Sequence, residues 1–171
     1  LRDVKLINPK ITTALRHYGG PQNIFDGRGF EAYKDLARQF FATFIDGTFR
    51  EQYARYTDIV VEWNEYLASS HSGQDLQDRI NWARAAAWVW RNEYRTQADY
   101  AHIRLGLLSC PVGNDIHRAF AEIALQYDCV LSYHAYDKHI NGQRDPLSWR
   151  YHCGRWAYME QSWGLKPDWM F

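Results

Sequence analysis

The chain has 171 residues, with 20 Lys and Arg against 20 Asp and Glu, so its formal net charge is zero when histidine is neutral. Zero net charge argues against a nucleic-acid binder that works by bulk charge and against a polybasic membrane-surface protein. Hydrophobic residues make up 46% of the chain and charged residues 23%, which is typical of a globular protein and excludes disorder as the main state. No run approaches the roughly 18 apolar residues that a membrane span needs.

Aromatic residues are frequent at 16%, with 8 Trp and 12 Tyr, a composition that suits both a core and carbohydrate stacking. The three cysteines, Cys110, Cys129 and Cys153, are odd in number and widely spaced, so we expect buried thiols, with one disulfide left open. The His and Cys residues of segment 134–153 match no usual zinc spacing, and no metal or other cofactor is predicted. Because the chain starts at Leu1, the compartment stays open, a secreted location included.

Short β-type runs alternate with longer segments of helical spacing. The predicted strands are 11–18, 58–64, 102–109, 129–136 and 168–171. The predicted helices are 29–56, 76–94, 115–127 and 146–163, and residues 4–8 are either the end of a preceding helix or a short strand. Apolar stripes mark the packed faces of the helices at Phe30, Tyr33, Ala37, Phe40, Phe41, Phe44, Leu76, Ile80, Ala83, Ala87, Trp90, Tyr94, Ile116, Phe120, Ile123, Ala124, Trp149, Cys153, Trp156 and Trp163. The alternation predicts an α/β fold with parallel strands and crossover helices.

The spacing of the strands further predicts a (β/α)₈ TIM barrel. One strand with its helix takes about 39 residues, and eight such units need roughly 310, which is within the usual range for this barrel. The chain therefore holds about half of a barrel, as one partial domain over residues 1–171 that begins and ends inside it.

The sharpest chemical signal is Trp63-Asn64-Glu65, which follows the apolar run 59–61. In (β/α)₈ barrels the active site lies at the carboxyl ends of the strands, so a carboxylate there is placed for catalysis and an amide there for a substrate hydroxyl. We expect Glu62, which alternates with Trp63, to pair with an arginine of the barrel such as Arg104.

The residues at several strand ends resemble clan A glycoside hydrolases, the large retaining (β/α)₈ group. D-I-V-V-E-W-N-E at 58–65 resembles their fourth strand, which ends in Asn-Glu with the Glu as general acid/base. S-Y-H-A-Y at 132–136 resembles the sixth strand, where an H-x-Y pattern is frequent, and A-L-R-H-Y at 14–18 resembles the third. D-W-M-F at 168–171 corresponds to the seventh strand, so the nucleophilic Glu would come just after Phe171. The resemblance covers units three to seven and assigns no family within the clan.

The resemblance implies a role for each candidate residue. Glu65 would be the proton donor, with its pKa raised in the free enzyme, and Asn64 would bind the 2-hydroxyl of the sugar. His134 or Tyr136 would hold the nucleophile or the sugar, and the floor of the site would be lined by Arg16 and His17. The candidates for stacking or polar contacts at the rim are Trp63, Tyr66, Trp149 and His139. The substrate would be an oligo- or polysaccharide, and the rest of the barrel or another chain would complete the fold.

Two other hypotheses stay open. The first is a barrel relic that binds carbohydrate without cleaving it. A Glu within two or three positions after Phe171 favours the enzyme, and any other residue there favours the relic. The second is an unrelated α/β protein in which Asn64-Glu65 is coincidental. It predicts a doubly wound sheet with its ligand at a topological switch point.

Overall fold

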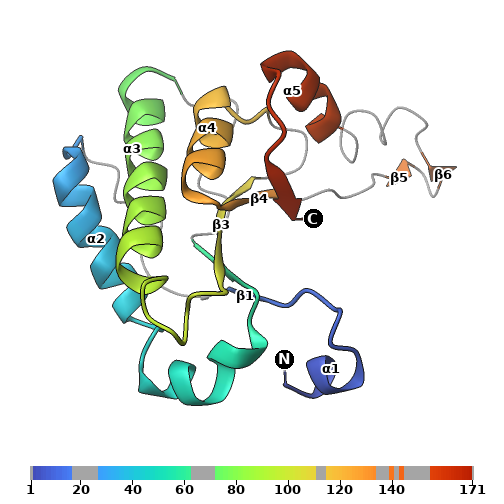
Figure 1. Ribbon diagram of the computed structural model, residues 1–171. Coiled ribbons are helices and arrows are strands. Elements are labelled where there is room, and N and C mark those ends of the chain that lie inside the picture. The colour runs from blue at the N-terminus through green and yellow to red at the C-terminus, as the bar shows by residue number, and fades with distance from the viewer. Residues whose placement is uncertain are drawn as a thin grey trace.

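The computed structural model of the chain describes residues 2–16, 27–62, 72–110, 115–133, 139–140, 143–144 and 155–170. Its centre is a five-stranded sheet in which all neighbours are parallel, in the order β1-β2-β3-β4-β7 (Figure 1). These strands are β1 (Ala14–Arg16), β2 (Ile59–Val61), β3 (Arg104–Cys110), β4 (Val130–Tyr133) and β7 (Asp168–Met170). Each overlaps a run for which the sequence predicts a strand. A separate antiparallel pair, β5 (His139–Ile140) and β6 (Gln143–Arg144), was not expected.

Helices occupy the segments between the strands. They are α1 (Arg2–Ile7), α2 (Phe30–Ala42), the π-helix η1 (Phe49–Tyr53), the 3₁₀-helix η2 (Ala54–Tyr56), α3 (Gly73–Val89), the π-helix η3 (Trp90–Tyr94), α4 (Arg118–Tyr127) and α5 (Arg155–Trp163). The helical alternative for residues 4–8 is therefore confirmed by α1. Among the described helices, none combines the length and the apolar character needed to cross a membrane.

The single helix predicted over 29–56 is wrong, because the chain breaks it after α2. Thr43 ends α2, and its backbone N–H reaches the carbonyls of Phe40 and Phe41. The carboxylate of Asp46 then accepts the backbone N–H of Phe49 at 2.8 Å. This is an N-cap contact, which satisfies a free N–H of a new helical turn and favours a restart over a continuous helix.

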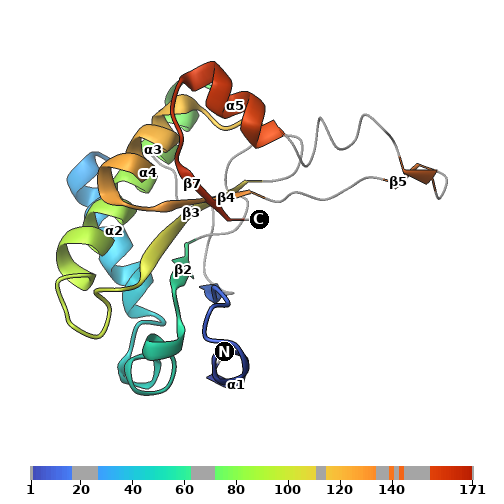
Figure 2. The same ribbon diagram turned by 45° about the vertical axis from the view of Figure 1, so that its right-hand side comes forward.

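The two faces of the sheet differ in what covers them. Alternate strand residues, Val60, Leu105 and Leu107 among them, join the main core together with the helices. Of the predicted stripe residues, this core buries Tyr33, Ala37, Phe40, Phe41, Ile80, Ala83, Ala87, Trp90, Ile116, Phe120, Ile123 and Ala124. Ile116 lies just before α4 and not within it. The partly buried stripe residues that pack against the core are Phe30, Phe44, Leu76, Tyr94, Trp156 and Trp163. Trp149 and Cys153 lie outside the described residues. The opposite face forms a second, smaller cluster that includes Ile59 and Val61. Figure 2 shows α2, α3 and α4 together on one side of the sheet.

The strand order contains no reversal within the described sheet. Each strand lies beside the next one in the chain, except that β4 is followed across the sheet by β7. Right-handed crossovers in one constant direction place every connecting helix on the same face, as seen for α2, α3 and α4. The predicted α/β class with parallel strands and crossover helices is confirmed. The described strands show no topological switch point of the kind that a doubly wound sheet has.

Candidate active site at the carboxyl edge of the sheet

The carboxyl ends of the five strands lie at one edge of the sheet, because all the strands are parallel. This edge is where parallel α/β proteins place their ligands. The pairing of β3 with β4 shifts between Leu107 and Cys110, close to this edge. Such irregularities are frequent next to active sites, since they redirect the residues that follow.

Arg16 is the one predicted binding residue that lies within the described part of the chain. It ends β1, pairs in register with Val61 of β2, and has an exposed side chain. Of the rim candidates, His139 starts β5 and pairs with Arg144 of β6. The remaining predicted residues lie outside the described residues: His17, Trp63, Asn64, Glu65, His134, Tyr136, Tyr66 and Trp149.

Glu62, the residue after β2, is the described carboxyl group nearest in the chain to the predicted site. Its side chain is 0% exposed, and one carboxyl oxygen accepts the indole N–H of Trp82 at 2.8 Å. Its backbone N–H donates to the carbonyl of Gly106 at 3.1 Å, which continues the β2–β3 pairing by one step. Glu62 is therefore held from both its backbone and its side chain.

The predicted pairing of Glu62 with Arg104 is wrong. Residues of a strand alternate between faces, so Glu62 lies on the face of Val60, toward α3 and its Trp82. Arg104 pairs in register with Ile59 and therefore belongs to the opposite face. The guanidinium of Arg104 binds Asp128 at 3.1 Å and Asp168 at 2.7 Å, at the other end of the strands.

One stripe of α3 contributes the polar groups that reach this edge. Gln74, Asp78 and Trp82 are spaced by four residues, which places them along one face of the helix. The amide of Gln74 donates to one oxygen of Asp78 at 2.7 Å, and the backbone N–H of Gly27 donates to the other at 3.0 Å. Asp78 is buried. Trp82 thus holds Glu62 at the end of β2, and Asp78 holds Gly27 just before α2.

This stripe was missed by the sequence reasoning, which read α3 for its apolar face. A signal was present, because an Asp and a Gln four residues apart in the first half of a buried helix need hydrogen-bond partners. The partners themselves could not be foreseen, since Gly27 lies 51 residues away from Asp78 in the chain.

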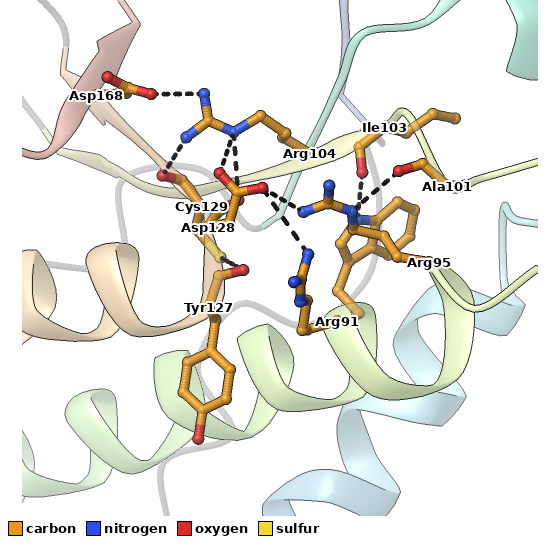
Figure 3. A network of polar contacts seen from close by, with 10 residues as sticks. Arg91, Arg95, Ala101, Ile103, Arg104, Tyr127, Asp128, Cys129 and Asp168 are labelled. Atoms are coloured by element: carbon orange, nitrogen blue, oxygen red, sulfur yellow. Dashed lines mark hydrogen bonds and ion pairs between the residues drawn. The ribbon is translucent and has the colours of Figure 1, made fainter.

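The opposite edge of the sheet, at the amino ends of the strands, holds a network of five charged residues, which we call the amino-edge network (Figure 3). Its members are Arg91, Arg95, Arg104, Asp128 and Asp168. Asp128, which caps α4 with φ 55°, accepts Arg95 at 2.7 Å. The guanidinium of Arg104 also donates to the carbonyl of Cys129 at 3.0 Å. The network joins η3, β3, α4 and β7, and in a barrel this end is associated with stability.

Two carboxylates at the amino ends of strands have lowered pKa values. Burial raises the pKa of Asp128, but the Arg95 hydrogen bond and the charges of Arg104, Arg95 and Arg91 outweigh it. Burial likewise raises the pKa of Asp58, and hydrogen bonds from Lys5 and Thr13 outweigh it. Both groups are therefore held as carboxylates by ion pairs and hydrogen bonds.

Cys129 is a free, buried cysteine, as the sequence predicts for this residue. Burial raises the pKa of its thiol, which keeps it protonated and unreactive. Within the described ranges, no group of three or more His, Cys, Asp or Glu side chains is arranged to hold a metal ion.

No family model, no curated protein and no solved structure matches this chain.

Proposed function

We propose that the chain is part of a retaining glycoside hydrolase that acts on an oligo- or polysaccharide, with Glu65 as the general acid/base. The observation that supports this most is the unreversed parallel order of the sheet. In the chain, Asn64 and Glu65 come shortly after β2, and His134 and Tyr136 come after β4. The nucleophile that the proposal requires would follow β7. Strands of one direction bring such residues toward one edge.

We also propose that the sheet is part of a (β/α)₈ barrel. The helices α2, α3 and α4 cover one face, and the other face presents small and β-branched residues, among them Ile59, Val61, Gly106 and Val130. Branched side chains of this kind fill barrel interiors. In the described sheet β1 and β7 each have one strand neighbour. Further strands, from the rest of a longer polypeptide or from another chain, would close the barrel there.

The chemistry is a double displacement between two carboxyl groups about 5–5.5 Å apart. The nucleophile attacks the anomeric carbon while Glu65 protonates the departing oxygen, and Glu65 then removes a proton from the water that releases the sugar. Asn64 binds the 2-hydroxyl, and Arg16 and His17 line the floor. His134 or Tyr136 orients the nucleophile or the sugar.

The test compares two variants in the full natural polypeptide. Glu65→Gln removes the acid, and Glu93→Gln changes the chain's other Asn-Glu dipeptide, where the carboxylate binds Arg38 at 2.7 Å. Both are assayed on a panel of α- and β-linked 4-methylumbelliferyl and 2,4-dinitrophenyl hexosides and pentosides. The dinitrophenyl group leaves without protonation, whereas a methylumbelliferyl glycoside or a natural glycoside depends more strongly on the acid.

We expect Glu65→Gln to lower kcat/KM on methylumbelliferyl glycosides by about 10²- to 10⁴-fold, as expected for loss of a general acid, and to affect dinitrophenyl glycosides much less. Glu93→Gln should match the unmodified protein on both. Equal effects of Glu65→Gln on the two leaving groups, or no hydrolysis of any panel member, would contradict the proposal. Calorimetric binding of oligosaccharides without hydrolysis would instead support the carbohydrate-binding relic.

A further inference from the structure

We infer that Trp82 and Glu62 form a positioning pair that sets the geometry of Glu65. The inference rests on the proposed function, because it assigns the pair a role in the step that needs the acid. Neither residue is a candidate for direct contact with the substrate, since both side chains are 0% exposed and lie between the sheet and α3.

The pair fixes the chain at the carboxyl end of β2. The indole N–H of Trp82 donates to Glu62 at 2.8 Å, and the backbone N–H of Glu62 donates to Gly106 at 3.1 Å. The Trp82 ring is itself held by an edge-on contact with Phe40, with 5.9 Å between ring centroids and 82° between ring planes. The Trp82 ring is therefore held between Phe40 on one side and Glu62 on the other.

Glu65 is three residues beyond Glu62 in the chain. A carboxyl group that must protonate a leaving oxygen needs accurate placement, and an error of about 1 Å can cost a factor on the order of 100 in rate. The strand before Glu65 is short, from Ile59 to Val61. The hydrogen bond from Trp82 therefore supplies a fixed point immediately before the segment that carries the acid.

The same stripe of α3 holds a second fixed point. One turn before Trp82, Asp78 accepts the backbone N–H of Gly27, where the chain enters α2. The segments that follow β1 and β2 carry His17, Asn64 and Glu65, so a single helix face supports the chain next to both segments. The inference therefore assigns α3 a function beyond packing.

The matched pair of variants is Trp82→Phe and Trp90→Phe. Trp82 lies on α3, and Trp90 begins η3, which directly continues α3. Both are buried, and each donates an indole hydrogen bond: Trp82 to Glu62 at 2.8 Å and Trp90 to the carbonyl of Ile103 at 3.0 Å. They differ in position, because eight residues of helix separate them by roughly 12 Å. Trp90 lies toward the amino edge of the sheet, and Trp82 lies toward the carboxyl edge.

The readout is the ratio of kcat/KM on a methylumbelliferyl glycoside to that on the dinitrophenyl glycoside of the same sugar, in the full natural polypeptide. This ratio does not depend on the fraction of folded protein, because both rates scale with it. We expect Trp82→Phe to lower the ratio about 10-fold or more and Trp90→Phe to leave it unchanged. Glu62→Gln keeps an oxygen to accept the indole N–H, so its ratio should stay close to that of the unmodified protein. Glu62→Leu removes that oxygen and should lower the ratio as Trp82→Phe does.

The outcomes separate this inference from the proposed function. A ratio that falls in Glu65→Gln but stays unchanged in Trp82→Phe overturns the positioning role alone. Equal falls in Trp82→Phe and Trp90→Phe also overturn it, because they would show a general effect of a weakened core. A ratio unchanged in Glu65→Gln overturns the proposed function itself.

Discussion

Gly106, in the middle of β3, has less room for a side chain than the other described glycines, on the face of the sheet that carries Ile59 and Val61. A Cβ placed there would lie 3.2 Å from a methyl carbon of Ile59 and 3.2 Å from a methyl carbon of Val61. Both neighbours are β-branched and have few alternative rotamers, so they cannot move aside easily. The same glycine also supplies the carbonyl that accepts the backbone N–H of Glu62.

We predict that Gly106→Ala destabilises the protein by about 1–3 kcal/mol, because overpacking outweighs the small entropic gain from losing a glycine. The control is Gly47→Ala, since a Cβ at Gly47 meets no atom within 4 Å and Gly47 has no positive φ. That variant should be neutral or more stable by up to about 1 kcal/mol. Urea unfolding of both variants measures the difference, and equal stabilities would contradict the packing argument.

At the scale of elements, the break between α2 and η1 shows that hydrophobic spacing alone does not predict where a helix ends. Apolar spacing continues from α2 into the following turn, so the spacing alone predicts one helix. Asp46 and Gly47 are both residue types that favour turns and caps, and that signal competes with the spacing. The structure resolves the competition in favour of the cap, with the contact from Phe49 to Asp46.

We predict that Asp46→Ala lowers the free energy of unfolding by about 1 kcal/mol, because it leaves the backbone N–H of Phe49 without its cap. Asp46→Asn keeps a side-chain oxygen that can accept this N–H. It should therefore lower the free energy of unfolding by only about a few tenths of 1 kcal/mol. Thermal or urea unfolding checks both variants. A loss in Asp46→Asn as large as in Asp46→Ala would show that charge, and not capping, is the source.

A comparison of elements also shows which parts of the structure the sequence predicts and which it does not. The strands were predictable because β-branched runs and alternating helices indicate parallel strands wherever they occur. The hydrogen-bond partner of Glu62 was not predictable. That partner depends on which face of β2 Glu62 occupies and on which residue of α3 lies opposite. Alternation along β2 separates Glu62 from Arg104, yet only the register of β2 with β3 makes that visible.

At the scale of the whole molecule, the two edges of the sheet carry different kinds of residues. The amino edge carries ion pairs that join strands and helices, and the residues proposed for catalysis follow the carboxyl edge. Asp128 is central at the amino edge, since it contacts Arg95 at 2.7 Å and Arg104 at 3.1 Å. The residue types that follow the strands predict the candidate site in outline, whereas the hydrogen bonds of Trp82 with Glu62 and of Asp78 with Gly27 required the three-dimensional structure.

We predict that Asp128→Asn lowers stability at pH 7 by about 1 kcal/mol, since half-exposed ion pairs contribute ~0.2–1 kcal/mol each. Asn is chosen because it tolerates the left-handed conformation that Asp128 adopts. The folded-state pKa of Asp128 is lowered, so its stabilisation is present above the unfolded-state pKa near about 4 and is lost as pH falls through the lower folded-state value. The difference between the unmodified protein and the variant should therefore shrink toward pH 2. Urea titrations across that range measure it, and a constant difference would contradict the assignment.

The unreversed strand order has a consequence for how the chain acquires its structure. Almost every strand finds its partner in the strand made just before it, so pairing proceeds between segments that are close in time during synthesis. Contacts of moderate sequence separation form faster than contacts that join distant parts of a chain. The strand–helix units can thus be added one after another in the direction of translation, and each finished unit offers the next strand an edge on which to assemble.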